Sequence, residues 1–322
     1  MVLKLEGIAL AVLLISTQAA ADPFPARDLN PLLAGFGLPS ALPARVPDDS
    51  WSIAADFNWA STSLAQRAGT EQLIVDAEIR EMRVTIGRSW PSGFAAQLEI
   101  PYRYTGGGVL DSAIDSWHDA FGLPEGARAS MPQDRIRIAY ARGSTVLLDM
   151  QSAADGLGDI ALDVGRSLYS ETSGAAAVWL SIKLPSGDAD RLTGSGATDV
   201  SLAIAGERRL GENWSAYGQA GVSRLGRGER LADQQQDIVW NGLAGIGWRM
   251  WRGLELKAQL DAHTAVFDDA NVDFLGDALV LTVGGDYRFA SGWQLDIAVS
   301  EDIAVESASD VVFVFGLRRS WK

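Results

Sequence analysis

Residues 254–263 read LELKAQLDAH, and this stretch decides the fold class because apolar and polar side chains alternate strictly along it. One face would carry Leu254, Leu256, Ala258, Leu260 and Ala262, and the other Glu255, Lys257, Gln259, Asp261 and His263. Alternation with a period of two residues indicates a β-strand with one apolar and one polar face.

The same alternation recurs along much of the chain, for example at 51–59, 94–103 and 293–300. These segments run for about ten residues, the length of a tilted membrane strand, whereas ordinary strands average about five or six. From residue 158 onward, short connections alternate with long ones. Tight turns that alternate with longer loops are typical of a transmembrane antiparallel up-and-down β-barrel with periplasmic turns and extracellular loops.

The pattern predicts an all-β fold of fourteen strands. We expect them at 51–60, 72–89, 93–104, 134–141, 145–151, 158–169, 175–184, 198–209, 214–224, 238–249, 254–264, 277–288, 293–302 and 310–320. The pair between 134 and 151 is short, and if it forms an extracellular hairpin the barrel has twelve strands. A phase change near Arg80 and Glu81 predicts a β-bulge in the second strand.

Composition excludes several kinds of chemistry. The chain of 322 residues has no cysteine, so it has neither a thiol nucleophile nor a Cys-type zinc site. A net charge of −14 argues against binding to a nucleic acid backbone. The 11 tryptophans, several of them at strand ends, suit an aromatic girdle at a membrane interface.

The chain divides into three parts. Residues 1–21 are predicted to be a secretory signal peptide, with an N-terminal membrane anchor as the alternative. Residues 22–50 hold six prolines, so neither a strand nor a stable helix is expected there. Residues 51–322 would form the barrel. The proline-rich segment is interpreted either as a plug in the lumen or as a periplasmic tail. Its apolar residues Leu32, Leu33 and Phe36 are expected to be buried away from water.

Polar residues on the predicted inner face are candidates for a substrate path, with a structural polar network as the alternative. They are Glu255, Lys257, Asp261, His263, Asp286, Arg288 and Asp296. The longest loop, 105–133, would supply a lid over the barrel mouth, with a self-packed outside loop as the alternative. The lid residues are Trp117, His118, Asp119 and Phe121. We expect no cofactor and no metal site, since the acidic loop at 187–190 lacks EF-hand spacing.

Three stretches together resemble one family. They are PFPARDLNPLLAGFGLP at 23–39, DSWHDAFGLPEGAR at 115–128 and LKAQLDAHTAVFDD at 256–269. They resemble a proteobacterial envelope family catalogued as domain of unknown function 3187, over nearly the whole predicted mature chain. The resemblance implies an outer-membrane barrel with no established activity.

A further stretch resembles a second group of barrels. Residues 183–199 read KLPSGDADRLTGSGATD and are similar to a loop of barrels associated with phenol-degradation pathways. Those barrels are in turn similar to long-chain fatty acid transporters, but a likeness of fold carries little functional weight.

These observations predict a passive or gated channel or transporter for a small molecule, including a hydrophobic one, in the outer membrane of a Gram-negative envelope. The alternatives are a closed structural barrel and a membrane-bound lipid-modifying enzyme built on His263 and Asp261; we expect no enzyme. Expected partners are outer-membrane lipid, lipopolysaccharide and the barrel-assembly machinery, whose signal the alternating aromatic residues at 313–321 resemble. No nucleic acid partner is expected.

Overall fold

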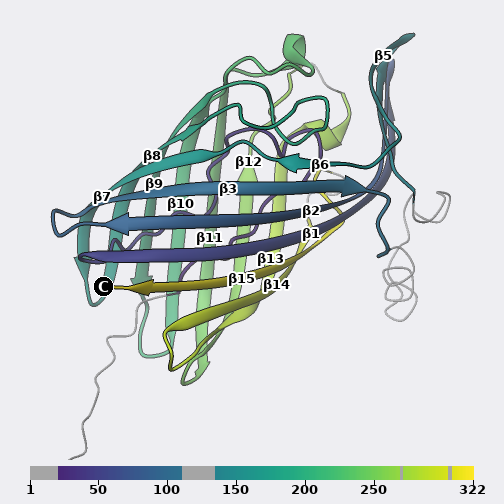
Figure 1. The fold of residues 1–322 in the computed structure, drawn as a ribbon. Helices are drawn as coiled ribbons and strands as arrows, with labels where there is room; N and C mark the ends of the chain where they lie inside the picture. The colour runs from purple at the N-terminus through teal and green to yellow at the C-terminus, as the bar shows by residue number, and fades with distance from the viewer. Residues whose placement is uncertain (1–20, 111–134, 269–270, 304–306) are drawn as a thin grey trace, which may run out of the picture.

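The computed structural model describes residues 21–110, 135–268, 271–303 and 307–322. Twelve antiparallel strands close into a barrel, each pairing with the next and the last with the first, from Trp51↔Trp321 to Ser61↔Val311 (Figure 1). The barrel strands are β1 (Ser50–Ala68), β2 (Glu71–Ser89), β3 (Phe94–Gly106), β7 (Ala161–Glu171), β8 (Gly174–Lys183), β9 (Asp199–Arg209), β10 (Trp214–Arg224), β11 (Ile238–Trp251), β12 (Leu254–His263), β13 (Ala278–Arg288), β14 (Trp293–Asp302) and β15 (Val311–Trp321).

Three further strands lie outside the barrel wall: β4 (Arg137–Arg142), β5 (Thr145–Met150) and β6 (Ala154–Leu157). The β1–β2 hairpin continues beyond the barrel, and the β4–β5 hairpin pairs with this extension of β2. Strand β6 pairs with the end of β3. The option of twelve strands plus an outside hairpin is therefore confirmed, and the count of fourteen barrel strands is wrong.

The second strand contains no bulge, contrary to the sequence-based expectation. The β1–β2 register runs without a shift from Ser50↔Ser89 to Ala68↔Glu71. The apparent phase change arises because the surroundings of both faces change along the strand. Towards the long loops, the inward residues are apolar and pack under those loops, whereas deeper in the barrel Glu81 and Arg83 face the lumen.

Two short 3₁₀ turns, η2 (Ala232–Gln234) and η3 (Asp273–Leu275), lie in the long loops. Within the described ranges, none of the helical segments has the length and apolar character needed to cross a membrane.

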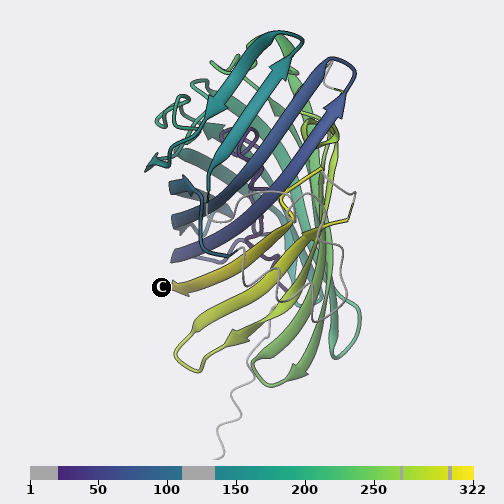
Figure 2. The same ribbon diagram turned by 90° about the vertical axis from the view of Figure 1, so that its right-hand side faces the viewer.

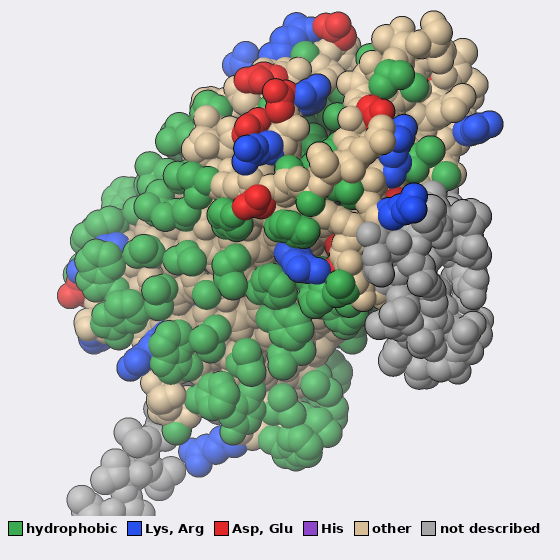
Figure 3. All heavy atoms as spheres, turned by 45° about the vertical axis from the view of Figure 1, so that its right-hand side comes forward, with side chains coloured by type: hydrophobic (Ala, Val, Ile, Leu, Met, Phe, Trp, Pro, Cys, Tyr) green, Lys and Arg blue, Asp and Glu red, His purple; other side chains and the backbone are tan. Residues whose placement is uncertain are grey.

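Large apolar side chains cover the outside of the barrel (Figure 3), as expected for a wall in contact with lipid. Exposed aromatic residues gather at the end of the short turns, which corresponds to the periplasmic end. They are Trp51, Trp90, Phe94, Tyr169, Trp214, Trp248, Trp251, Tyr287, Phe289 and Trp321. The molecule therefore has the apolar belt and the aromatic girdle of a membrane barrel.

Residues 21–49, hereafter the lumen segment, run inside the barrel instead of joining its wall (Figure 2). Buried residues of this segment pack against inward-facing residues of the wall in several separate clusters. Within the described residues the interior is consequently filled by packed side chains and the lumen segment, without a wide pore through it.

Candidate functional site

The lumen segment forms an ascending limb, a turn and a descending limb. The ascending limb starts at Ala21, near the short-turn end. At the turn, Nδ2 of Asn30 donates to the carbonyl of Phe274 in a long loop, 2.6 Å away. The descending limb returns to the short-turn end and continues into β1 at Ser50. Both limbs therefore traverse the lumen.

Two glutamines bond to the backbone of the segment much as a neighbouring strand would. Gln259 of β12 accepts a hydrogen bond from the Phe24 N–H at 2.8 Å and donates to the Phe24 carbonyl at 3.4 Å. Gln219 of β10 accepts from the Leu42 N–H at 2.8 Å and donates to the Ser40 carbonyl at 3.2 Å. One glutamine thus holds each limb.

The prolines make burial of this irregular backbone feasible. Buried N–H and C=O groups need partners, and a proline has no N–H to satisfy. Its carbonyl still needs a donor, and wall side chains supply three. The carbonyls of Pro23, Pro25 and Pro43 accept from Arg318 (3.2 Å), Asn58 (3.3 Å) and Trp179 Nε1 (2.9 Å), respectively.

A charged cluster holds the start of the ascending limb. The Lys257 Nζ lies 3.1 Å from a carboxylate oxygen of Asp286 and 3.0 Å from one of Asp296, and its side chain is fully buried. It also donates to the Asp22 carbonyl at 2.8 Å and sits 4.1 Å from the centroid of the Phe24 ring. One wall cation therefore joins two strands to the segment.

A second cluster holds the turn and the start of the descending limb. The Lys183 Nζ lies 2.7 Å from Asp159 and 2.9 Å from Asp199, and donates to the Gly35 carbonyl at 3.0 Å. The Asp199 carboxylate also accepts the N–H of Gly37 at 2.7 Å. These contacts fix the segment to the end of the barrel that carries the long loops.

A cation also bridges the two limbs. The Arg27 guanidinium reaches the carbonyl of Leu38 at 3.5 Å. This contact joins the ascending limb to the descending limb.

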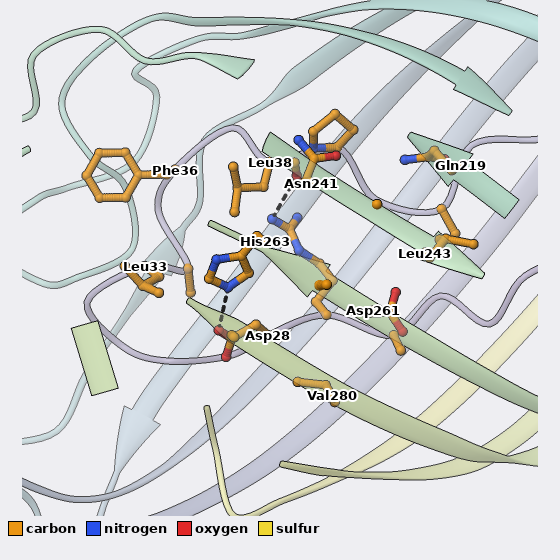
Figure 4. Close-up of a pocket in the computed structure, with 18 residues that line it drawn as sticks. Asp28, Leu33, Phe36, Leu38, Gln219, Asn241, Leu243, Asp261, His263 and Val280 are labelled. Atoms are coloured by element: carbon orange, nitrogen blue, oxygen red, sulfur yellow. Dashed lines mark hydrogen bonds and ion pairs between the residues drawn. The ribbon is translucent and has the colours of Figure 1, made fainter. Parts of the chain in front are cut away.

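Next to this bridge, a cavity of about 70 Å³ separates the lumen segment from β10–β13 (Figure 4). His263 lies there with its Nε2 3.1 Å from a carboxylate oxygen of Asp28, and Asp261 accepts from Gln259 at 2.9 Å. The cavity has room for a few waters, whereas sites for drug-sized ligands start at about 300 Å³. Among its described lining residues there is no serine or threonine.

Two more cavities continue the row through the lumen. One of about 40 Å³ shares Arg27 and Leu38 with the first, and a vestibule of about 290 Å³ lies towards the short turns. Arg83 and Glu99 line both the cavity of about 40 Å³ and the vestibule. The lumen is thus a row of separate cavities, divided by side chains and by the lumen segment.

The residues predicted for the lumen all lie on inward-facing positions of β12–β14. Lys257, Asp286 and Asp296 come together in one cluster, whereas Asp261 and His263 line the small cavity. The other two lie nearer the short turns, where Glu255 accepts from Ser215 at 2.9 Å and Arg288 lies 3.8 Å from the Asp22 carboxylate.

The remaining candidates divide between the lumen segment and an undescribed loop. Leu32, Leu33 and Phe36 are buried in a cluster beneath the long loops. Trp117, His118, Asp119 and Phe121 lie outside the described residues, as do residues 1–20 of the predicted signal peptide.

Sequence reasoning missed the polar residues that hold the descending limb. Lys183, Asp199 and Gln219 belong to β8, β9 and β10, at inward positions of the same period-two pattern. The period-two pattern that places the polar faces of β12–β14 inward also places these three residues inward, so it is the signal that could have identified them.

Comparison with known proteins agrees with this architecture. The model of the family described as protein of unknown function (DUF3187) matches residues 8–321. No curated protein matches the chain. Among solved structures, the COG4313 outer membrane channel from Pseudomonas putida F1 is similar, with 13% identity, coverage of 86% of this chain and 97% of that one, and a TM-score of 0.57.

Two further solved structures show weaker similarity. The KdgM porin has 9% identity, covers 84% of this chain and 99% of its own, and gives a TM-score of 0.45. The toluene transporter TodX from Pseudomonas putida has 9% identity, covers 94% of each chain and gives a TM-score of 0.38. With the apolar belt and the closed barrel, the fold places the protein in the outer membrane.

Proposed function

The chain belongs to the DUF3187 family, and we propose that it is a gated outer-membrane channel for a small molecule, closed by its own lumen segment. The observation that carries the proposal is the row of cavities, which the lumen segment divides. The similar barrel from P. putida F1 is described as an outer membrane channel, which supports a transport role by analogy of fold.

The way the segment is bound supports a gate that can move. It is held by individual side-chain bonds, such as those of Gln219 and Gln259, and it shares no strand ladder with the wall. Single bonds of this kind contribute about 1 kcal/mol each, so they can break separately. In this proposal Asp261, His263 and the Lys257 cluster would line the path that opens.

A reversible crosslink tests this gate. The chain has no native cysteine. A Cβ at Gly37 would lie 2.8 Å from the Asp199 Cβ, so a small shift brings the pair to disulfide geometry. We expect the Gly37→Cys/Asp199→Cys variant to show conductance steps in planar bilayers when reduced, and few or none when oxidised.

Two controls make the outcome decisive. Asp199→Cys alone loses the same carboxylate but cannot crosslink, so oxidation should leave its conductance unchanged. Deleting 23–47 should give larger steps than the full-length protein. If the truncated barrel is folded and heat-modifiable on a gel yet gives no steps, the protein is a closed structural barrel.

The proposal includes the absence of hydrolytic activity. A lipid hydrolase based on His263 would need a nucleophile, and the described lining of its cavity offers no serine or threonine hydroxyl. We therefore expect His263→Ala to leave the envelope-lipid profile unchanged; an altered profile would favour the enzyme. Contacts with lipopolysaccharide and with the barrel-assembly machinery also belong to the proposal.

A further inference from the structure

Arginine and aromatic side chains alternate along the short-turn rim of six neighbouring strands, β14, β15, β1, β2, β3 and β7. Three directly paired positions carry the pattern: Trp293↔Arg319, Trp51↔Arg88 and Phe94↔Arg166. We call these six residues the rim arc.

Each guanidinium in the rim arc lies against its paired ring. The Cζ of Arg166 is 4.4 Å from the Phe94 centroid, the Cζ of Arg88 is 5.4 Å from that of Trp51, and the Cζ of Arg319 is 5.7 Å from that of Trp293. These distances fall within the range of cation–π contacts. A ring that covers one side of a guanidinium leaves the N–H groups at its edge uncovered. One N–H of Arg166 donates to the Ser92 carbonyl at 2.7 Å and one of Arg88 donates to Asp49, so the remaining edge N–H groups are those available to a ligand.

The stagger of the strands keeps the arc parallel to the rim. Arg319 pairs with Ile53, whereas the arc continues at Trp51, two residues closer to the short turns. Arg88 pairs with Ala96, whereas the arc continues at Phe94, again two residues closer. Barrel strands are tilted, so residues paired directly across neighbouring strands lie progressively farther from the short turns. The two-residue offsets towards the short turns compensate for this tilt and hold the arc at one depth in the membrane.

The arc carries positive charge that its surroundings leave uncompensated. Arg88 forms an ion pair with Asp49, but among the described residues no carboxylate lies within ion-pair distance of Arg166 or Arg319. The other side of the same rim differs. There Trp214 and Trp248 stack at 6.1 Å, and no described guanidinium lies over either ring.

We propose that the rim arc binds the headgroup phosphates of anionic phospholipids in the periplasmic leaflet. A planar guanidinium matches a phosphate through paired N–H donors. Exposed apolar residues would contact the acyl chains. Examples are Ile86, Leu98 and Leu162, which lie two to four residues along their strands from the arc, away from the short turns. The positive charge of the arc favours phosphatidylglycerol, which carries a net negative charge, over phosphatidylethanolamine, whose ammonium group the arginines would repel.

Lipid retention tests the proposal. Refolded full-length protein in vesicles of equal phosphatidylglycerol and phosphatidylethanolamine is extracted in mild detergent, and retained lipids are counted by native mass spectrometry. We expect wild-type protein to be enriched in phosphatidylglycerol, and Arg88→Gln/Arg166→Gln/Arg319→Gln to lose at least about fivefold of this preference. The control Arg208→Gln/Arg227→Gln/Arg230→Gln removes the same number of positive charges outside the rim arc. It should keep most of the preference for phosphatidylglycerol.

The outcomes are separable. An equal loss in both triple variants would mean that net charge, not the arc, attracts the lipid, and would overturn the proposal. A wild-type protein without phosphatidylglycerol enrichment would also overturn it. If the triple variant fails to give a heat-modifiable barrel, Arg166→Gln and Arg319→Gln singly, each against Arg208→Gln, provide the same comparison.

Discussion

Replacing Lys257 by methionine should destabilise the barrel and loosen the lumen segment. Lys257 is the one cation in direct ion-pair contact with Asp286 among the described residues, at 3.1 Å, and it also donates to the Asp22 carbonyl. Methionine keeps most of the side-chain volume but removes the described ion-pair partner of the buried Asp286 carboxylate. The perturbation therefore acts on charge pairing and far less on packing.

The magnitude follows from which charges stay paired. Removing one partner of a buried ion pair costs about 3–5 kcal/mol. Asp296 retains Arg318 at 2.7 Å, so only Asp286 loses its ion pair. We therefore expect the lower limit, about 3 kcal/mol. With urea m-values of about 1–3 kcal/mol/M, the unfolding midpoint should fall by about 1–3 M.

Urea unfolding of the refolded protein in lipid vesicles measures this shift. The matched control is Arg227→Met, which breaks the Arg227–Asp233 pair; its distance is also 3.1 Å, but both side chains are exposed. Exposed pairs contribute about 0–1 kcal/mol, so this midpoint should hardly move. Lys257→Met/Asp286→Asn should recover part of the loss. Equal midpoints for Lys257→Met and Arg227→Met would refute the reasoning.

Three further substitutions probe other parts of the molecule. Gly35→Ala should raise the frequency of channel opening in planar bilayers, because its Cβ would lie 2.8 Å from the backbone carbon of Gly194 and displace the turn of the lumen segment. Ile138→Ala should cost about 2–5 kcal/mol of local packing at a fully buried site; faster trypsin cleavage of the β4–β5 hairpin, with an intact heat-modifiable barrel, would show it. Trp214→Ala should lose about 1 kcal/mol of stacking on Trp248, measurable as a lower urea midpoint.

The barrel itself could be predicted because its determinants are local. Each wall strand must be apolar towards lipid and polar or small towards the lumen, so the period of two is visible within any ten residues. In β14, Leu295 and Ile297 face outward while Asp296 faces the lumen, as the alternation predicted. Short turns then divide the pattern into hairpins without any knowledge of distant contacts.

Strand number and length were harder to predict because they depend on what each hairpin meets. Strands β4 and β5 have six residues each and extend only about 20 Å at 3.3 Å per residue, too short to cross a bilayer at the barrel tilt. Their alternation still resembles that of a membrane strand. Strand β1 runs to Ala68 instead of 60, because above the membrane its inward residues, such as Leu64, pack under the long loops.

The course of residues 21–49 could not be predicted, and the reason lies in how that segment is bound. Its backbone is satisfied by side chains more than a hundred positions away, such as Trp179 on the Pro43 carbonyl and Gln219 on Leu42. No local period records such bonds. A tail in water and a buried segment could share the same six prolines, since both conditions favour a backbone with few N–H donors. The two cases differ only in the barrel wall. In a plugged barrel, inward-facing amides and cations on strands as distant as β8 and β12 donate hydrogen bonds to the backbone carbonyls of the lumen segment.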